Sequence, residues 1–178
     1  MTSQELLNNI LIVEDKKNDV DIVLHYLTKA YPDSVFTVCN SVAEFKEKYQ
    51  WTIPDLIICD FDLPDGNGLE ILLHVKSTAT EIPFIYFSGT LSSASVLGDA
   101  ILHGASGYLL KENVRQLPEQ VEKVVTNFHQ KISKKQKVQD IINEVKLKSQ
   151  QAAQLANECN NDKLNDLLQS NLTLLNEL

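Results

Sequence analysis

The side chains best suited to chemistry in this 178-residue chain each stand at the end of a short apolar segment. They are Glu14, Asp15, Asp60, Ser88 and Lys111. Carboxylate oxygens are ligands that Mg²⁺ prefers, and a carboxylate can also act as a nucleophile toward phosphorus. A lysine ammonium and a serine hydroxyl can hold the oxygens of a phosphoryl group. Together these residue types favour a site for a divalent cation and a phosphoryl group.

Asp60 is the residue that we expect to accept the phosphoryl group, as an aspartyl phosphate. A cation is needed because Asp60 and the incoming group are both anionic. We expect Mg²⁺ to be held by Glu14 and Asp15 together with Asp60. Lys111 would pair with one phosphoryl oxygen, and Ser88 would donate a hydrogen bond to another. Catalysis at such a site consists of positioning and charge neutralisation.

Strand-like and helix-like segments alternate along the first 128 residues. Short apolar runs predict strands at 9–13, 34–39, 55–59, 83–88 and 107–110. Apolar residues at helical spacing predict helices at about 18–30, 42–49, from 68 onward, 92–103, and from Val114 past Ile132. Five βα units with short connections predict an α/β fold with a doubly wound parallel sheet. Ligands bind at the carboxyl ends of the strands in such sheets, so the five residues should converge on one cleft.

The remaining residues predict a helical C-terminal extension. We divide the chain into a domain at 1–128 and an extension at 129–178, because no Gly or Pro occurs after Pro118. Three apolar residues continue a heptad pattern past the boundary: Val138, Ile142 and Val145. Residues 160–162 predict a break before a second leucine-rich stripe at 164–178. Two short amphipathic helices usually need a partner, so we expect a homodimer or a coiled-coil contact through this extension.

Composition excludes several classes of protein. The formal net charge of −8 argues against a nucleic-acid-binding surface, which requires clustered Lys and Arg. No run of about 18 apolar residues predicts a membrane-spanning helix, and the first residues lack the pattern of a signal peptide. Cys39, Cys59 and Cys159 are too widely spaced to predict a disulfide framework or a zinc site. We therefore expect a cytoplasmic protein.

Four motifs occur in order along the domain. They are Glu14-Asp15, then Asp60 with Leu63-Pro64-Asp65-Gly66-Asn67-Gly68, then Phe87-Ser88-Gly89, then Tyr108-Leu109-Leu110-Lys111. Over about residues 8–128 this pattern resembles the receiver domain of two-component response regulators. The resemblance implies a flavodoxin-like sheet of order 2-1-3-4-5, with Asp60 as the phospho-acceptor and Glu14 and Asp15 as magnesium ligands. It also implies Lys111 as the family's conserved lysine, Ser88 as the switch hydroxyl and Tyr108 as the switch aromatic.

The resemblance further implies a role in signalling rather than in metabolic turnover. The donor would be a phosphohistidine on a sensor histidine kinase or a histidine phosphotransfer protein. The only reaction would be self-catalysed gain and loss of the phosphoryl group at Asp60, with output through protein contacts. Two residues depart from the family pattern: Glu112 stands where a Pro usually follows the lysine, and Asp62 is acidic at a variable position. Glu112 predicts a differently shaped loop, with an extra carboxylate near the site.

Two other interpretations fit parts of the same pattern. Asp60-Phe61-Asp62 followed by a serine and a lysine also resembles haloacid-dehalogenase-type phosphatases. That family places its nucleophile after the first strand and needs a further acidic pair after the lysine, and neither feature is evident here. The other alternative is a vestigial receiver that acts only as a binding module. All the required residue types are present, which favours an active site.

Overall fold

The computed structural model describes residues 7–78, 81–89, 102–158, 166, 168–171 and 173. The chain separates into two compact units, Met1–Phe128 and His129–Leu178. The predicted helix at 92–103 falls largely outside the described residues, as does most of the leucine-rich stripe at 164–178.

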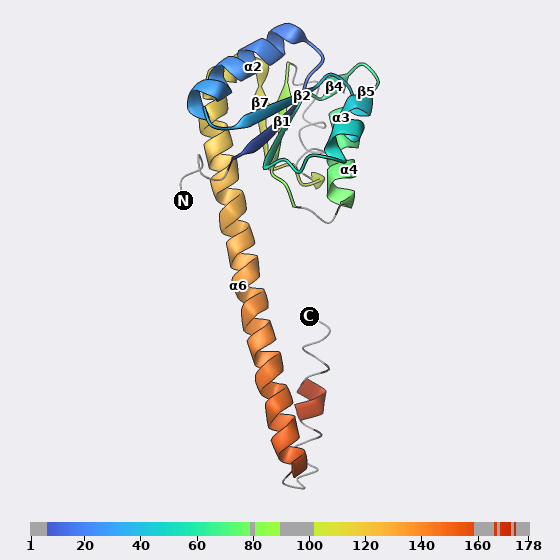
Figure 1. The fold of residues 1–178 in the computed structure, drawn as a ribbon, viewed down its shortest axis with the longest axis vertical. Coiled ribbons are helices and arrows are strands. Elements are labelled where there is room, and N and C mark those ends of the chain that lie inside the picture. Colours follow the sequence, from blue (N-terminus) through green and yellow to red (C-terminus); the bar gives the residue numbers. More distant parts are fainter. Residues whose placement is uncertain are drawn as a thin grey trace. The chain divides into compact units, whose positions relative to one another are not determined.

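The first unit is built on a five-stranded sheet in which every neighbouring pair is parallel (Figure 1). Its strands are β1 (Asn9–Val13), β2 (Val35–Cys39), β3 (Leu56–Cys59), β6 (Phe84–Ser88) and β7 (Gly107–Leu110). Their order across the sheet is β2-β1-β3-β6-β7, which is 2-1-3-4-5 when only the strands of this sheet are counted. The predicted α/β fold and its strand order are therefore confirmed.

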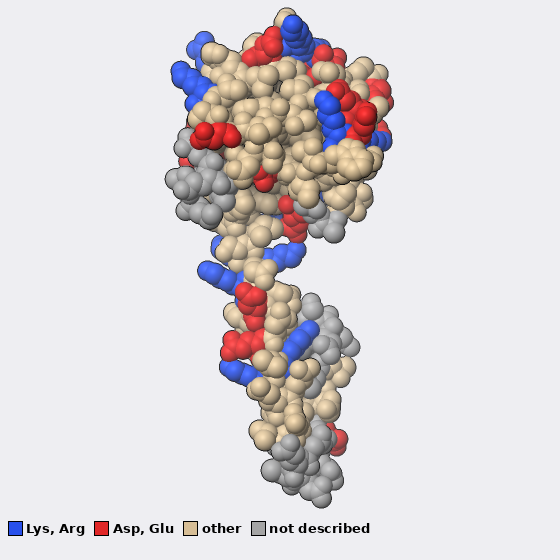
Figure 2. All heavy atoms as spheres, viewed as in Figure 1, with Lys and Arg blue, Asp and Glu red and all other residues tan. Residues whose placement is uncertain are grey.

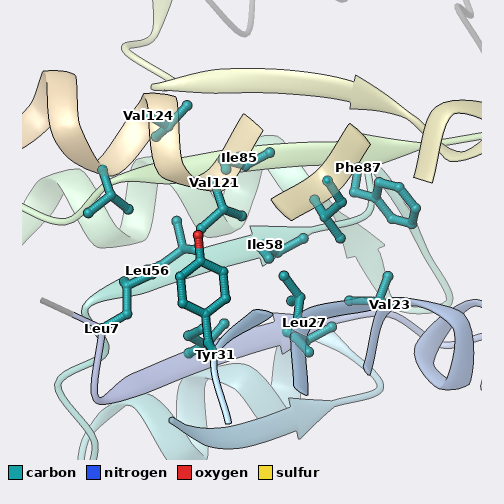
Figure 3. Packing of buried hydrophobic residues seen from close by; sticks show 14 of the residues in the cluster. Leu7, Val23, Leu27, Tyr31, Leu56, Ile58, Ile85, Phe87, Val121 and Val124 are labelled. Carbon is teal, nitrogen blue, oxygen red and sulfur yellow. The ribbon is translucent and has the colours of Figure 1, made fainter. Parts of the chain in front are cut away.

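Side chains of the central strands alternate between two apolar layers. In β1, Ile10 and Ile12 enter one core cluster, whereas Leu11 and Val13 enter the other. The first cluster is completed by helix α2 (Lys17–Ala30) and by the beginning of helix α6 (Leu117–Glu158). Figure 3 shows this packing. Because β1, β3 and β6 are covered on both faces, they are apolar at nearly every position, as is typical of parallel strands.

Helices α3 (Val42–Tyr49) and α4 (Gly68–Ser77) cover the opposite face of the sheet. Ser41 caps the beginning of α3, since its hydroxyl accepts a hydrogen bond of 3.1 Å from the backbone N–H of Glu44. The carboxylate of Glu44 reaches one residue further back than a capping box requires and accepts from the N–H of Asn40 at 2.6 Å.

Two local elements differ from the sequence prediction. A small antiparallel hairpin, β4 (Asp62–Leu63) and β5 (Gly66–Asn67), lies between β3 and α4. The Asp65 carboxylate at its turn accepts hydrogen bonds from the backbone N–H groups of two residues that open α3, at 2.8 and 2.9 Å. The last predicted helix does not begin at Val114, because residues Lys111–Gln116 form the 3₁₀-helix η1 and α6 starts at Leu117.

The second unit contains the continuation of α6, which is helical as far as Glu158. Within this part of the helix, several large apolar side chains are exposed to solvent: Val138, Ile141, Val145, Leu147 and Leu155. Figure 2 shows acidic and basic side chains interspersed along this helix on the face in view. None of the described helices is long and apolar enough to cross a membrane.

Gly68 sets how closely α4 approaches the end of β3. A Cβ atom at Gly68 would lie 2.6 Å from the carbonyl oxygen of Asp60 and 2.8 Å from Cε1 of Tyr86. We therefore expect Gly68→Ala to lower the free energy of unfolding by about 1–3 kcal/mol, the usual cost of overpacking. Urea unfolding measures the change. The control is Gly89→Ala, whose Cβ would meet nothing nearer than Lys111 Cδ at 3.7 Å. Equal stability of the two variants would contradict this prediction.

Candidate functional site

Three carboxylates meet where β1 and β3 end. Glu14 and Asp15 follow β1, and Asp60 follows the neighbouring strand β3. The strands hold these residues in register, since the N–H of Asp60 donates to the carbonyl of Val13 at 2.8 Å. One oxygen from each carboxylate lies within 4.8 Å of the others. Glu14 and Asp60 are almost fully buried, whereas Asp15 is exposed. The predicted convergence of these carboxylates is thus present in the structure.

Lys111 follows β7 and places its ammonium group among carboxylates. Its Nζ donates hydrogen bonds of 2.7 Å to Asp60 Oδ2 and 2.7 Å to Asp19 Oδ2. A third contact, of 2.5 Å, is an ion pair with Glu14 Oε2. The ammonium also lies 5.9 Å from the centre of the Phe87 ring, within the range of a cation–π interaction. The positive charge therefore offsets several negative charges at the buried end of the sheet.

The two oxygens of Asp60 have different surroundings. Oδ1 accepts a hydrogen bond of 2.6 Å from the N–H of Phe61, and the N–H of Asp62 makes a longer contact of 3.5 Å with the same atom. Oδ2 faces the ammonium of Lys111. These contacts fix the rotation of the carboxylate, so that one oxygen is held by the following backbone and the other lies beside the lysine.

The electrostatics of the site are dominated by burial. Burial raises the pKa of Glu14 to about 7, and the charge of Asp60 adds to this effect, although Lys111 opposes it. Burial acts to lower the pKa of Lys111, but its contacts with the carboxylates of Asp19, Asp60 and Glu14 outweigh burial and raise this pKa above its usual range. The ammonium therefore stays charged, while the buried Glu14 carboxylate is costly to ionise.

The residues present fit a magnesium ion. Glu14 Oε2 is buried and accepts no well-oriented hydrogen bond from the described residues, despite its ion pair with Lys111. A buried carboxylate oxygen without a hydrogen-bond donor is suited to a cation. Asp15 and Asp60 supply further oxygens, and this all-oxygen donor set is the kind that Mg²⁺ prefers. Glu14, Asp15 and Asp60 would hold the ion.

Ser88 lies on β6, the strand beside β3, and Tyr108 lies on β7, one strand further out in the sheet. Ser88 is buried at the end of β6, where it pairs in register with Leu110 of β7. Its hydroxyl makes no hydrogen bond with Asp60 or Lys111 within the described part of the chain. Tyr108 is half-buried on β7, and burial followed by the charge of Asp60 raises its pKa. Ser88 is therefore placed at the predicted edge of the sheet without a direct contact to the acceptor carboxylate.

Sequence reasoning missed Asp19 and misplaced Glu112. Asp19 lies in the first turn of α2 and contacts Lys111, although an acidic residue in a first helical turn is common and signals no particular role. Glu112 is exposed on η1 and does not join the Glu14, Asp15 and Asp60 cluster in the described structure. The residues from Lys111 to Gln116 form the 3₁₀-helix η1, and the loop shape expected from Glu112 stays a prediction.

Comparison with known proteins agrees with this geometry. The family model for the response regulator receiver domain matches residues 10–122. The chain belongs to the response regulator receiver family. Its strand order and the position of the acidic cluster after the first and third strands of the main sheet are consistent with that membership.

Curated relatives of this receiver are longer proteins. The DNA-binding transcriptional activator DevR/DosR of Mycobacterium tuberculosis is 38% identical over 73 residues, which are 41% of this chain and 33% of the relative. A protein-glutamate methylesterase/protein-glutamine glutaminase of Trichodesmium erythraeum is 34% identical over 103 residues, which are 57% of this chain and 29% of that protein. The receiver thus matches only about a third of the length of these relatives.

Solved structures show the same fold. A CheY-like response regulator receiver domain protein from Methanospirillum hungatei superposes with a TM-score of 0.63 at 23% identity, covering 70% of this chain and 98% of that one. The BeF₃-activated receiver domain of DrrB gives a TM-score of 0.59 at 22% identity, covering 67% of this chain and 98% of that chain.

The raised pKa of Glu14 predicts an unusual dependence of stability on pH. Between pH 7 and 4.5 the folded protein binds a proton at Glu14 that the unfolded chain does not, so this group adds stability as the pH falls through that window. Without Mg²⁺, lowering the pH from 8 to 5.5 should raise the free energy of unfolding of the wild type relative to Glu14→Gln by about 1–2 kcal/mol. Denaturant unfolding at each pH measures this difference. Parallel pH profiles for the two proteins would contradict it.

Proposed function

We propose that this receiver is a phosphorylation-dependent switch of a two-component system, with Asp60 as the phospho-acceptor. The observation that carries the proposal is the arrangement around Asp60, where Oδ1 is held by backbone N–H and Oδ2 lies 2.7 Å from Lys111 Nζ. Glu14 and Asp15 lie close enough to bind a cation together with Asp60. Family membership supports a signalling role for the domain as a whole.

The proposed reaction is direct transfer between a donor and Asp60. A carboxylate oxygen of Asp60 forms a new P–O bond while the P–N bond of a donor phosphohistidine breaks, and the electron pair returns to the imidazole nitrogen. Lys111 would pair with a phosphoryl oxygen. Bound Mg²⁺ would neutralise part of the charge that accumulates as two anionic groups approach. The donor would belong to a sensor histidine kinase or a histidine phosphotransfer protein.

Ser88 and Tyr108 are proposed to pass the change at Asp60 to the surface. The Ser88 hydroxyl lies at the same edge of the sheet and would donate a hydrogen bond to a new phosphoryl oxygen. The pKa of Tyr108 already responds to the charge on Asp60, which supports an electrostatic link between the two residues. A local change in charge would thereby shift the population of two conformations.

We also propose that the protein is cytoplasmic, which is supported by the free, buried thiols of Cys39 and Cys59.

Neither alternative is favoured by the site. A haloacid-dehalogenase-type phosphatase would carry its nucleophile after the first strand, whereas Asp60 follows β3, the third strand along the chain. A vestigial receiver would be expected to lack one of the reacting groups. Here Asp60, Lys111 and the acidic pair before α2 are present and assembled. The protein is therefore proposed to undergo phosphoryl gain and loss at Asp60 without enzymatic turnover of another substrate.

The proposal is tested by phosphoryl uptake at Asp60. Incubation with acetyl phosphate and Mg²⁺ should give one phosphoryl adduct on the wild type, seen by intact mass, and none on Asp60→Asn. The matched control is Asp62→Asn, which removes the same charge from an exposed neighbour and should still form the adduct. Chelation of Mg²⁺ should suppress labelling. If acetyl phosphate gave no adduct, a phosphohistidine donor would be the second test. An adduct that persists on Asp60→Asn, or wild type inert to both donors, would contradict the proposal.

We further propose that the extension makes a homodimer through α6. Val138, Ile141, Val145 and Leu155 are exposed and recur at spacings that place them at the a and d positions of heptads. Ile141 replaces Ile142 of the sequence prediction in this register, because Ile142 is only partly exposed. Exposed apolar residues at this spacing are typical of a helix that packs against a second helix. A second copy of the chain is the simplest partner that supplies a matching stripe.

Dimerisation predicts a difference between two lysine substitutions. Ile141→Lys places a charge on the apolar stripe and should convert the dimer to a monomer at micromolar concentration. Leu147→Lys changes an equally exposed leucine that lies off the stripe and should leave the dimer intact. Light scattering of the full chain measures both masses. A monomeric wild type would overturn the prediction, with or without a phosphoryl mimic.

A further inference from the structure

Carboxylates surround the ammonium of Lys111 in this structure, which donates hydrogen bonds to Asp19 and Asp60 and forms an ion pair with Glu14. A lysine ammonium carries three N–H groups. The Nζ of Lys111 contacts three carboxylates, those of Glu14, Asp19 and Asp60. If Lys111 is to hold an oxygen of a phosphoryl group on Asp60, one of these contacts has to give way.

Asp19 is the partner that Lys111 can release at the lowest cost. The side chains of Glu14 and Asp60 are each 2% exposed, whereas that of Asp19 is 27% exposed. A carboxylate that water can reach is solvated again when its ion pair breaks, but a buried carboxylate is not. Asp19 is also outside the group of three carboxylates suited to a metal ion, so a bound cation would not hold it in place.

We propose that Asp19 is a positioning residue that occupies the phosphoryl-binding donor of Lys111 in the unphosphorylated protein. In this state Asp19 keeps the lysine side chain directed into the site. On phosphorylation, the phosphoryl oxygen replaces Asp19 as the acceptor, and the Asp19 carboxylate turns to water. Asp19 therefore competes with the phosphoryl group for Lys111, and the strength of that ion pair sets how tightly the site holds a phosphoryl group.

This inference rests on the proposed function, because it needs Asp60 to carry the phosphoryl group. Beryllofluoride is a suitable probe, since BeF₃ activates the receiver domain of DrrB, which has the same fold. The experiment measures beryllofluoride affinity by ¹⁹F NMR at saturating Mg²⁺, and Mg²⁺ affinity separately by calorimetry. Both use the full chain.

Asp19→Asn should bind beryllofluoride about two- to fivefold more tightly than the wild type, the scale expected for a partly exposed ion pair. The matched control is Asp21→Asn, which removes the same charge from an exposed position on the same helix and should change the affinity little. Asp19→Glu restores a carboxylate and should bring the affinity back toward that of the wild type. Mg²⁺ affinity should change alike in Asp19→Asn and Asp21→Asn. If Asp19 had only a structural role, Asp19→Asn would not strengthen beryllofluoride binding while leaving Mg²⁺ affinity equal to that of Asp21→Asn.

The outcomes separate this inference from the proposed function. If the wild type binds beryllofluoride and Asp60→Asn does not, the proposed function stands. In that case, equal or weaker binding by Asp19→Asn than by Asp21→Asn overturns the role of Asp19 alone. If the wild type does not bind beryllofluoride, the role of Asp19 fails, and phosphoryl uptake at Asp60 decides the proposed function separately. Asp19→Ser provides a second neutral variant with a residue that is favoured near helix N-termini, should Asp19→Asn fold poorly.

Discussion

The attraction between one lysine and the carboxylates around it is the interaction on which this site depends. Glu14 and Asp60 are buried side by side, and two negative charges in such a place repel each other and resist ionisation. Lys111 reaches both from β7 and also contacts Asp19. The ammonium of Lys111 thus offsets part of the free-energy cost of burying these carboxylates. The part that it does not offset raises the pKa of Glu14.

The sheet is what makes this arrangement possible. Parallel strands end at a common edge, so residues far apart in the chain, such as Glu14 and Lys111, meet once β1 and β7 are in place. Because Gly68 has no Cβ atom, α4 can begin close to the backbone carbonyl of Asp60. Asp65 ties the hairpin after Asp60 to the beginning of α3. The apolar core and these local contacts therefore position the charged groups of the site.

Much of this could be predicted from the sequence because it follows from repeating patterns. Apolar runs ending in Glu14-Asp15 and Asp60 indicated both the strands and the edge where the side chains meet. Asp19 could not be found this way, because its contact with Lys111 depends on the angle of α2 against the sheet and not on spacing. The 3₁₀-helix at 111–116 could not be predicted either, because the spacing of Val114 from later apolar residues is the same whether its own turn is α-helical or 3₁₀.

Under the proposed function, Asp60 and no other residue carries the phosphoryl group. Reduction of an acyl phosphate with borohydride converts the aspartate to homoserine, which remains after digestion and can be located by peptide sequencing. After treatment of the phosphorylated full chain, we expect homoserine at position 60 and at no other aspartate. Homoserine at Asp62 or Asp15, or its absence from a chain that has taken up a phosphoryl group, would contradict Asp60 as the phospho-acceptor.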